Sequence, residues 1–303
     1  MSIWFDDYAN GVETAFLNGT IKSKVFVKQP MGYNDKNGKV CKLSKALYRL
    51  CESSSVWYEC FDEYIKKLDF QRSENNYCLY MKYESDDVIY LILFVDDLLI
   101  CGKNKGKIDE IKNKLWNRFA MKDLGEVKTY LGINIEYDHK KCEMKLDQNS
   151  YIESLAKRYN LENSKLYFTL MEQNLNLEPA QSASDDIRYR NLIRALLYII
   201  TGTRLDVSYI VNYLSRFQYT YDGTHYKYAL RILKCLYLTR KLRLTYKRNL
   251  NPEVINCFVD ADWAGDKIDR KSTTEFIIRF FGSAIYWKSR KQSSVTKSST
   301  ATE

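Results

Sequence analysis

Histidine, proline and glycine are scarce in this 303-residue chain, and each scarcity excludes a class of protein. With 3 Pro and 12 Gly, the chain is neither collagen-like nor a proline-rich linker. Two His and eight scattered Cys, without a C-x-x-C pair, supply neither a zinc cage nor a disulfide framework. No run of about 18 uncharged apolar residues occurs, so we expect no membrane span. No N-terminal segment has the pattern of a signal peptide, so we expect an intracellular, cytoplasmic protein.

The composition is that of a folded protein with an excess of positive charge. Hydrophobic residues make up 45% and aromatic residues 14%, enough to form a sizeable core. The length suffices for two domains of about 150 residues each. The 47 Lys and Arg exceed the 38 Asp and Glu, which gives a net charge of +9. Such an excess favours contact with polyanions such as nucleic acids.

Positive charge is concentrated between residues 225 and 250, where no Asp or Glu occurs and tyrosines are interleaved. Two interpretations remain open: a solvated helix face, or a surface that follows nucleic-acid phosphates. The candidate nucleic-acid-binding residues of this segment are Lys227, Arg231, Lys234, Arg240 and Lys241.

The first 160 residues are predicted to mix helices and strands. Helical spacing of apolar residues predicts helices over 44–68, 108–119 and 151–159. Alternating or continuous apolar runs predict strands over 12–17, 25–27, 77–83, 88–101, 131–137 and 143–146. The dipeptide Asn18-Gly19 predicts a hairpin turn between the first two of these strands.

After residue 162 the periodicity is lost, and we expect a linker over 163–186. Helices are predicted over about 187–200, 204–217 and 225–240, followed by strands over 254–259, 274–281 and 283–287.

Two adjacent aspartates, Asp96 and Asp97, interrupt a strongly apolar segment that runs from Tyr90 to Cys101. Burying a bare carboxylate is costly unless a cation or several donors compensate it. At the turn of a tight hairpin both acids would reach a sheet edge, where Mg²⁺ takes oxygen ligands and leaves room for phosphate oxygens. A solvent-exposed turn, with Asp serving only turn chemistry, is the alternative.

Seven sequence blocks, in order, resemble the polymerases of copia-type retrotransposons. The segment Phe94-Val95-Asp96-Asp97 resembles the (Y/F)-x-D-D hairpin of reverse transcriptases. The other blocks are Val12–Gly19, Gln29–Gly32, Cys41–Tyr48, Leu131–Ile135, Leu197–Arg204 with Asp206, and Val259–Gly265 with Asp269–Thr274. Seven ordered blocks are far more specific than any one motif.

The resemblance implies an α+β fold of four segments. We expect a reverse transcriptase palm with partial fingers and the start of the thumb over 1–162, then the linker over 163–186. A helical connection segment over 187–250 and a truncated RNase H-like β-sheet over 251–303 would follow.

The resemblance also implies a catalytic site. In such polymerases three carboxylates hold two Mg²⁺ ions that activate the primer 3′-hydroxyl and stabilise the triphosphate. Asp96 and Asp97 match two of these carboxylates. Phe16 matches the aromatic that lies under the incoming sugar, although an ordinary core aromatic would fit the same position. Val12 and Glu52 are the other residues expected at the nucleotide.

Two departures from the family pattern predict impaired polymerase activity. Gly11 stands at the position of the third carboxylate. Glu13, two residues further on the same face of the expected strand, lies about 6.6–7 Å away, beyond what metal geometry tolerates. Glu52 replaces the Gln that helps to seat the nucleotide, and it brings a negative charge towards the triphosphate.

The C-terminal segment predicts a second, incomplete metal site. Asp260 matches the first metal-binding Asp of RNase H enzymes, and Glu303 matches the carboxylate of their helix. Asp262 is expected to cap or pair locally. The later carboxylates of those enzymes have no counterpart here, so we expect no RNase H activity.

Two hypotheses about function therefore remain. The chain is either a reverse transcriptase region that acts on an RNA template, a DNA primer and dNTP with Mg²⁺, or a non-catalytic remnant that binds nucleic acid. The resemblance further implies integrase and protease regions of a parent polyprotein and a virus-like particle.

Overall fold

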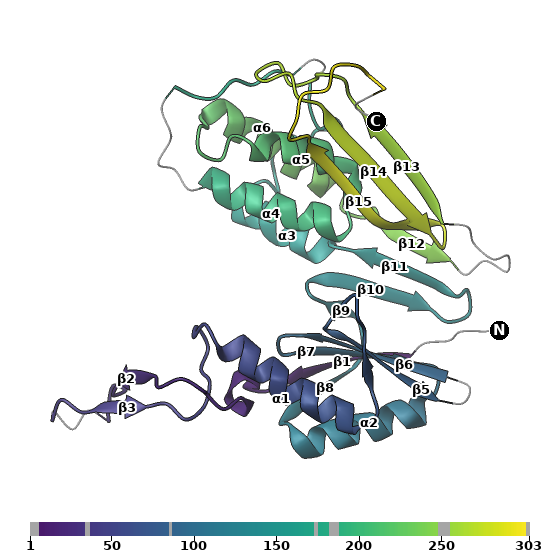
Figure 1. Ribbon diagram of the computed structural model, residues 1–303. Helices are drawn as coiled ribbons and strands as arrows, with labels where there is room; N and C mark the ends of the chain where they lie inside the picture. Colours follow the sequence, from purple (N-terminus) through teal and green to yellow (C-terminus); the bar gives the residue numbers. More distant parts are fainter. Residues whose placement is uncertain are drawn as a thin grey trace. The chain divides into compact units, whose positions relative to one another are not determined.

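The computed structural model describes residues 6–33, 37–84, 87–172, 175–181, 188–247 and 255–300. They form two compact units, Met1–Val127 and Lys128–Glu303. Figure 1 shows the elements of each unit.

The first unit is built on a six-stranded antiparallel sheet in the order β4-β5-β6-β7-β1-β8. Its strands are β1 (Asp6–Val12), β4 (Gln71–Arg72), β5 (Leu79–Glu84), β6 (Asp87–Phe94), β7 (Asp97–Gly102) and β8 (Met121–Glu126). Successive residues of β6 and β7 alternate between buried and half-buried, as expected for a sheet with one covered face.

Helices α1 (Ser53–Lys67) and α2 (Lys105–Arg118) cover the buried face of this sheet. Both present apolar residues at helical spacing, which form one core with alternate residues of β5, β6 and β7. The α2 helix begins at an N-cap, because the Asn104 side chain accepts a hydrogen bond from the Lys107 N–H at 3.3 Å.

The predicted strand over 12–17 and its hairpin are wrong. The strand ends at Val12, Thr14 takes a left-handed φ of 49°, and η1 (Ala15–Asn18) is a short 3₁₀-helix. The Gly19 N–H closes η1 by donating to the Phe16 carbonyl at 3.0 Å. Asn18-Gly19 therefore ends a helical turn.

The strand predicted at 25–27 pairs with a different partner, and the first helix starts later than expected. Strand β2 (Phe26–Lys28) pairs with β3 (Val40–Lys42). Helix α1 begins at Ser53 and not near residue 44, because Ala46 donates its N–H to the Gly19 carbonyl at 3.0 Å and Thr20 bridges to Lys45.

In the described residues, the second unit combines helices with two antiparallel sheets (Figure 1). Helices α3 (Asn149–Arg158), α4 (Arg188–Gly202), α5 (Ser208–Ser215) and α6 (Gly223–Leu238) share one apolar core, and η2 (Leu205–Val207) precedes α5. One sheet consists of β12 (Leu244–Lys247), β11 (Glu143–Asp147), β10 (Ile133–Asp138) and β9 (Thr129–Tyr130), in that order. The other consists of β13 (Asn256–Ala261), β14 (Thr273–Phe280) and β15 (Ser283–Lys291).

The division at residue 127 differs from the boundary expected at residue 162. Strand β11 pairs with β12, more than ninety residues later, and α3 packs on α6. The C-terminal sheet also belongs to this unit, because Trp287 donates its indole N–H to the Ile200 carbonyl at 2.6 Å. Residues 128–162 therefore pack with the segments that follow them.

In the part of the chain that the structure describes, none of the helices has the length and apolar character that crossing a bilayer requires.

Candidate active site of the first unit

The β6–β7 hairpin carries the two aspartates at its tip. Phe94 pairs with Asp97, so Val95 and Asp96 form a two-residue turn. Val95 has a φ of 57°, in the left-handed region that a β-branched residue rarely adopts. Such a conformation costs roughly 1–2 kcal/mol and persists only where the surroundings hold it.

Trp57 of α1 holds this turn in place. Its indole N–H donates to the Val95 carbonyl at 2.6 Å. The indole is 1% exposed and packs edge-on to Phe119, with ring centroids 5.3 Å apart. The helix therefore fixes the tip of the hairpin through a buried side chain on the covered face of the sheet.

Asp97 lies on the opposite, open face of the sheet. Its neighbours along β7 alternate, with Leu98 and Ile100 buried in the core and Asp97 half-buried. Partial burial raises the pKa of the Asp97 carboxyl, and the adjacent Asp96 carboxylate raises it further. A nearby cation would relieve both effects.

Gly11 lies directly beside this pair. In the β1–β7 ladder Gly11 is the residue opposite Asp97, and the next residue, Val12, donates its N–H to the Asp96 carbonyl at 2.7 Å. Val12 is buried in the core, so a side chain at position 11 would point to the open face, like that of Asp97. A Cβ built on Gly11 meets no atom within 4 Å.

Glu13 does not extend this face, because the strand ends at Val12. Glu13 lies in the turn that follows, where its N–H donates to the Ala120 carbonyl at 2.8 Å. The expectation that it continues the strand is wrong.

The three residues expected at the nucleotide have separate local roles. Val12 is a core residue, 4% exposed. Phe16 packs its ring edge-on to Tyr48, with centroids 4.5 Å apart, and is half-buried against the core. Glu52 precedes α1 and accepts a hydrogen bond from the Ser23 hydroxyl at 2.5 Å. Their role at a nucleotide stays a prediction.

The second predicted acidic site is only partly within the described residues. Asp260 is exposed on β13 and pairs with Glu275 of β14, and its carboxylate accepts the Ala261 N–H at 2.9 Å. Asp262 accepts the Thr273 N–H, so it pairs locally as expected. Glu303 lies outside the described residues.

Two arginines of the basic segment form ion pairs within the second unit. Arg231 contacts Glu172 at 2.7 Å and Arg240 contacts Glu153 at 3.1 Å. Lys234 stands over the ring of Tyr167, 5.6 Å from its centroid, whereas Lys227 and Lys241 are exposed. The paired arginines are therefore less available to phosphates than the sequence pattern suggests.

Comparison with known proteins identifies the family. Residues 8–173 match the family described as reverse transcriptase (RNA-dependent DNA polymerase). The chain is 33% identical over 96% of its length to a retrovirus-related Pol polyprotein from transposon TNT 1-94 of Nicotiana tabacum, and 34% identical over 96% to one from transposon RE1 of Arabidopsis thaliana. A Saccharomyces cerevisiae protein attributed to transposon Ty5-1 is 32% identical over 92% of each chain.

The chain belongs to the reverse transcriptase family.

This reverse transcriptase chain spans 23% and 20% of the tobacco and Arabidopsis polyproteins, respectively, and nearly all of the Ty5-1 relative. The matched family residues include the β6–β7 hairpin, β1 from residue 8 onwards and the whole of the first unit's core.

Reverse transcriptases generally use divalent metal ions, and the residues present do not fit a three-carboxylate clamp. The hairpin supplies Asp96 and Asp97, but Gly11 supplies no oxygen. Among the described residues, three or more His, Cys, Asp or Glu side chains do not come together as a metal-holding group.

Sequence reasoning missed two features of this site. Trp57 was placed only as a helix residue, although its hydrogen bond secures the hairpin tip. Helices α1 and α2 cover one face of the sheet and leave Asp97 on the opposite face. This arrangement depends on tertiary packing. The sequence of β6 gives no signal for two distinct faces, because its half-buried positions Val88, Tyr90 and Ile92 are as apolar as its buried ones.

Proposed function

We propose that the chain is the reverse transcriptase region of a copia-type Pol polyprotein whose nucleotidyl transfer is impaired by glycine at position 11. The observation that carries the proposal is the β1–β7 register, in which Gly11 stands opposite Asp97. The register supports the view that a carboxylate at this position would share the open face with the two hairpin acids.

Loss of one of the three carboxylates is expected to lower the reaction rate by more than the proportion of ligands that is lost. Members of a catalytic unit act together, and removing one can cost on the order of 10⁴ in rate. Two neighbouring acids without a third ligand still attract a cation, but they define fewer of its coordination positions. Glu52 adds a negative charge near the start of α1, which disfavours an incoming triphosphate.

The substrates follow from the same assignment. The chain would act on an RNA template and DNA primer with dNTP and Mg²⁺, and its parent would carry integrase and protease regions, packaged in a virus-like particle. The names of the tobacco and Arabidopsis relatives support a parent Pol polyprotein. The β13–β14–β15 sheet would belong to an RNase H-like domain, with Asp260 on its first strand.

Primer extension on an RNA template tests the proposal. With Mg²⁺ and all four dNTPs, we expect the unmodified chain and Asp96→Asn to extend a labelled primer equally, both at the level of the reaction without protein. Extension by the unmodified chain that disappears in Asp96→Asn would show an intact metal site and overturn the impairment.

A further inference from the structure

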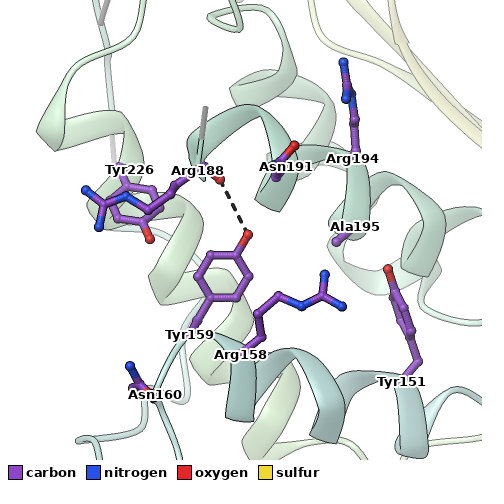
Figure 2. Close-up of a pocket in the computed structure, with 9 residues that line it drawn as sticks. All are labelled: Tyr151, Arg158, Tyr159, Asn160, Arg188, Asn191, Arg194, Ala195 and Tyr226. Atoms are coloured by element: carbon purple, nitrogen blue, oxygen red, sulfur yellow. Dashed lines mark hydrogen bonds between the residues drawn. The ribbon is translucent and has the colours of Figure 1, made fainter. Parts of the chain in front are cut away.

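A cavity of about 530 Å³ lies in the second unit where α3, α4 and α6 meet. It is lined mainly by arginine and tyrosine side chains, with two asparagines (Figure 2). The residues of interest are Arg158, Arg188, Arg194, Tyr151, Tyr159 and Tyr226. A volume of this size lies within the range of about 300–1,000 Å³ that is usual for small-molecule sites.

The lining carries positive charge on Arg158 and Arg194. Among the residues that the structure describes, no Asp or Glu lines the cavity. Within the described residues, Arg158 and Arg194 make neither an ion pair nor a hydrogen bond, and both are exposed.

Several other arginines of the same unit are held by carboxylates. They are Arg204 with Asp206, Arg216 with Asp266, Arg231 with Glu172, Arg240 with Glu153, and Arg243 with both Asp147 and Glu136. Arg158 and Arg194 both line this cavity and have no carboxylate partner among the described residues, which makes the cavity a candidate place for an external anion. Guanidinium groups suit phosphate in particular, because their planar fork matches its oxygens.

The aromatic side chains add a second kind of contact. The Arg188 guanidinium carbon lies 5.7 Å from the centroid of the Tyr226 ring. Tyr159 donates its hydroxyl to the Arg188 carbonyl at 3.5 Å, which orients that ring beside the cavity. Figure 2 shows Arg158 extending its guanidinium between Tyr159 and Tyr151.

We propose that this cavity binds one nucleotide unit of single-stranded nucleic acid, with its phosphates at Arg158 and Arg194 and its base against a tyrosine ring. The proposal rests on the assignment of the chain to nucleic-acid chemistry. Single strands are favoured over duplexes because only an unpaired base can turn out of its stack to meet an aromatic face.

Direct binding measurements on the full chain test this site. A fluorescein-labelled single-stranded oligonucleotide of twelve thymidines is titrated with the unmodified chain, Arg158→Gln, Arg194→Gln and the double variant. Lys157→Gln is the matched control, because it removes the same charge from the same last turn of α3 and does not line the cavity. Each cavity variant should weaken binding about tenfold at 0.1 M salt, whereas the control should leave it within about twofold of the unmodified chain.

The salt dependence supplies a second readout that does not depend on absolute affinity. Each lost phosphate contact should reduce the slope of log affinity against log salt by about 0.7, so the double variant should differ from the unmodified chain by about 1.4. Circular dichroism melting of every variant confirms that folding is unchanged.

Three results would overturn the inference. The first is equal binding by all variants, and the second is equal weakening by Lys157→Gln, which would indicate diffuse charge attraction. The third is displacement of the oligonucleotide by dTTP or inorganic phosphate at lower concentration than by unlabelled oligonucleotide, which would make a free nucleotide or phosphate the ligand. None of these results bears on primer extension, so failure of the cavity proposal is separable from failure of the proposed function.

Discussion

The surroundings of Asp97 disfavour the ionised form of its carboxyl group. Partial burial and the neighbouring Asp96 carboxylate both hold its pKa above the usual 3.8 in the folded chain. The folded chain therefore binds this proton more tightly than the unfolded chain, and the free energy of unfolding decreases as pH rises through these two pKa values. The decrease in the free energy of unfolding is complete at neutral pH and is absent below the ordinary pKa of Asp.

Asp97→Asn should accordingly be more stable than the unmodified chain at pH 7, and the difference should vanish as pH falls below about 3.8. Urea unfolding at several pH values measures it. Asp69→Asn, on an exposed turn of the same unit, is the control and should show no comparable gain. A loss of stability at pH 7 in Asp97→Asn would mean that a compensating donor surrounds this carboxylate.

Trp57 provides a prediction about the strained turn. Trp57→Phe removes the donor to the Val95 carbonyl and leaves a small void, which should lower the free energy of unfolding by about 2 kcal/mol. The matched control is Trp116→Phe on α2, where the indole is 39% exposed and the change should be within about 0.5 kcal/mol. Equal effects of the two substitutions would contradict the anchoring role of Trp57.

At the scale of elements, the sequence predicted what depends on local periodicity. Helix α2, the β6–β7 hairpin and the three-stranded C-terminal sheet lie close to their predicted ranges, because apolar spacing determines each of them. The segment after Val12 was mispredicted as a strand. Its apolar run is bent by the left-handed Thr14 and closed into η1, and both features come from packing against α1.

The site could be predicted only in part for the same reason. Asp96 and Asp97 are adjacent in the sequence, so the pair could be predicted. The register that brings Gly11 opposite Asp97 joins strands more than eighty residues apart, so it could not be predicted from local pattern. The arginine cavity likewise combines the end of α3 with the start of α4, and no motif connects these residues.

Helix α6 offers a test of element stability through its N-cap. The Asp222 carboxylate accepts the Thr224 N–H at 2.8 Å and the His225 N–H at 3.2 Å. Asp222→Ala should lower the free energy of unfolding by about 1–2 kcal/mol at pH 7, while Asp222→Asn, which keeps the acceptor, should cost much less.

The pH dependence of this cap follows from its pKa. A side-chain hydrogen bond with His225, followed by backbone N–H bonds, holds the pKa of Asp222 below 3.8. Its stabilisation is therefore present above that value and is lost as pH falls through the lowered pKa. Thermal melts of Asp222→Ala and the unmodified chain should differ less at low pH than at pH 7, because the charge is lost while a neutral acceptor remains, and a difference that is the same at all pH values would assign the effect to something other than the cap charge.

At the scale of the whole molecule, each of the two units contains its own core cluster. We expect a fragment of residues 128–303 to unfold cooperatively by itself. A fragment of residues 163–303 should not, because it lacks Ile152, Leu155 and Ala156 of α3 and the β11 partner of β12. Circular dichroism melts of both fragments distinguish the division at residue 127 from one at residue 162, and a cooperative melt of the shorter fragment alone would favour the latter.

The central claim is the proposal that glycine at position 11 impairs nucleotidyl transfer by this chain. The most direct measurement compares primer extension by Gly11→Asp with that by Gly11→Asn, since the two side chains have the same shape, a Cβ at this position meets no atom within 4 Å, and only one is a carboxylate. The account predicts that Gly11→Asp raises extension by orders of magnitude, that Gly11→Asn leaves it at background, and that adding Asp96→Asn abolishes the gain. Background extension by Gly11→Asp, in a chain that still binds its template and primer, would contradict the claim.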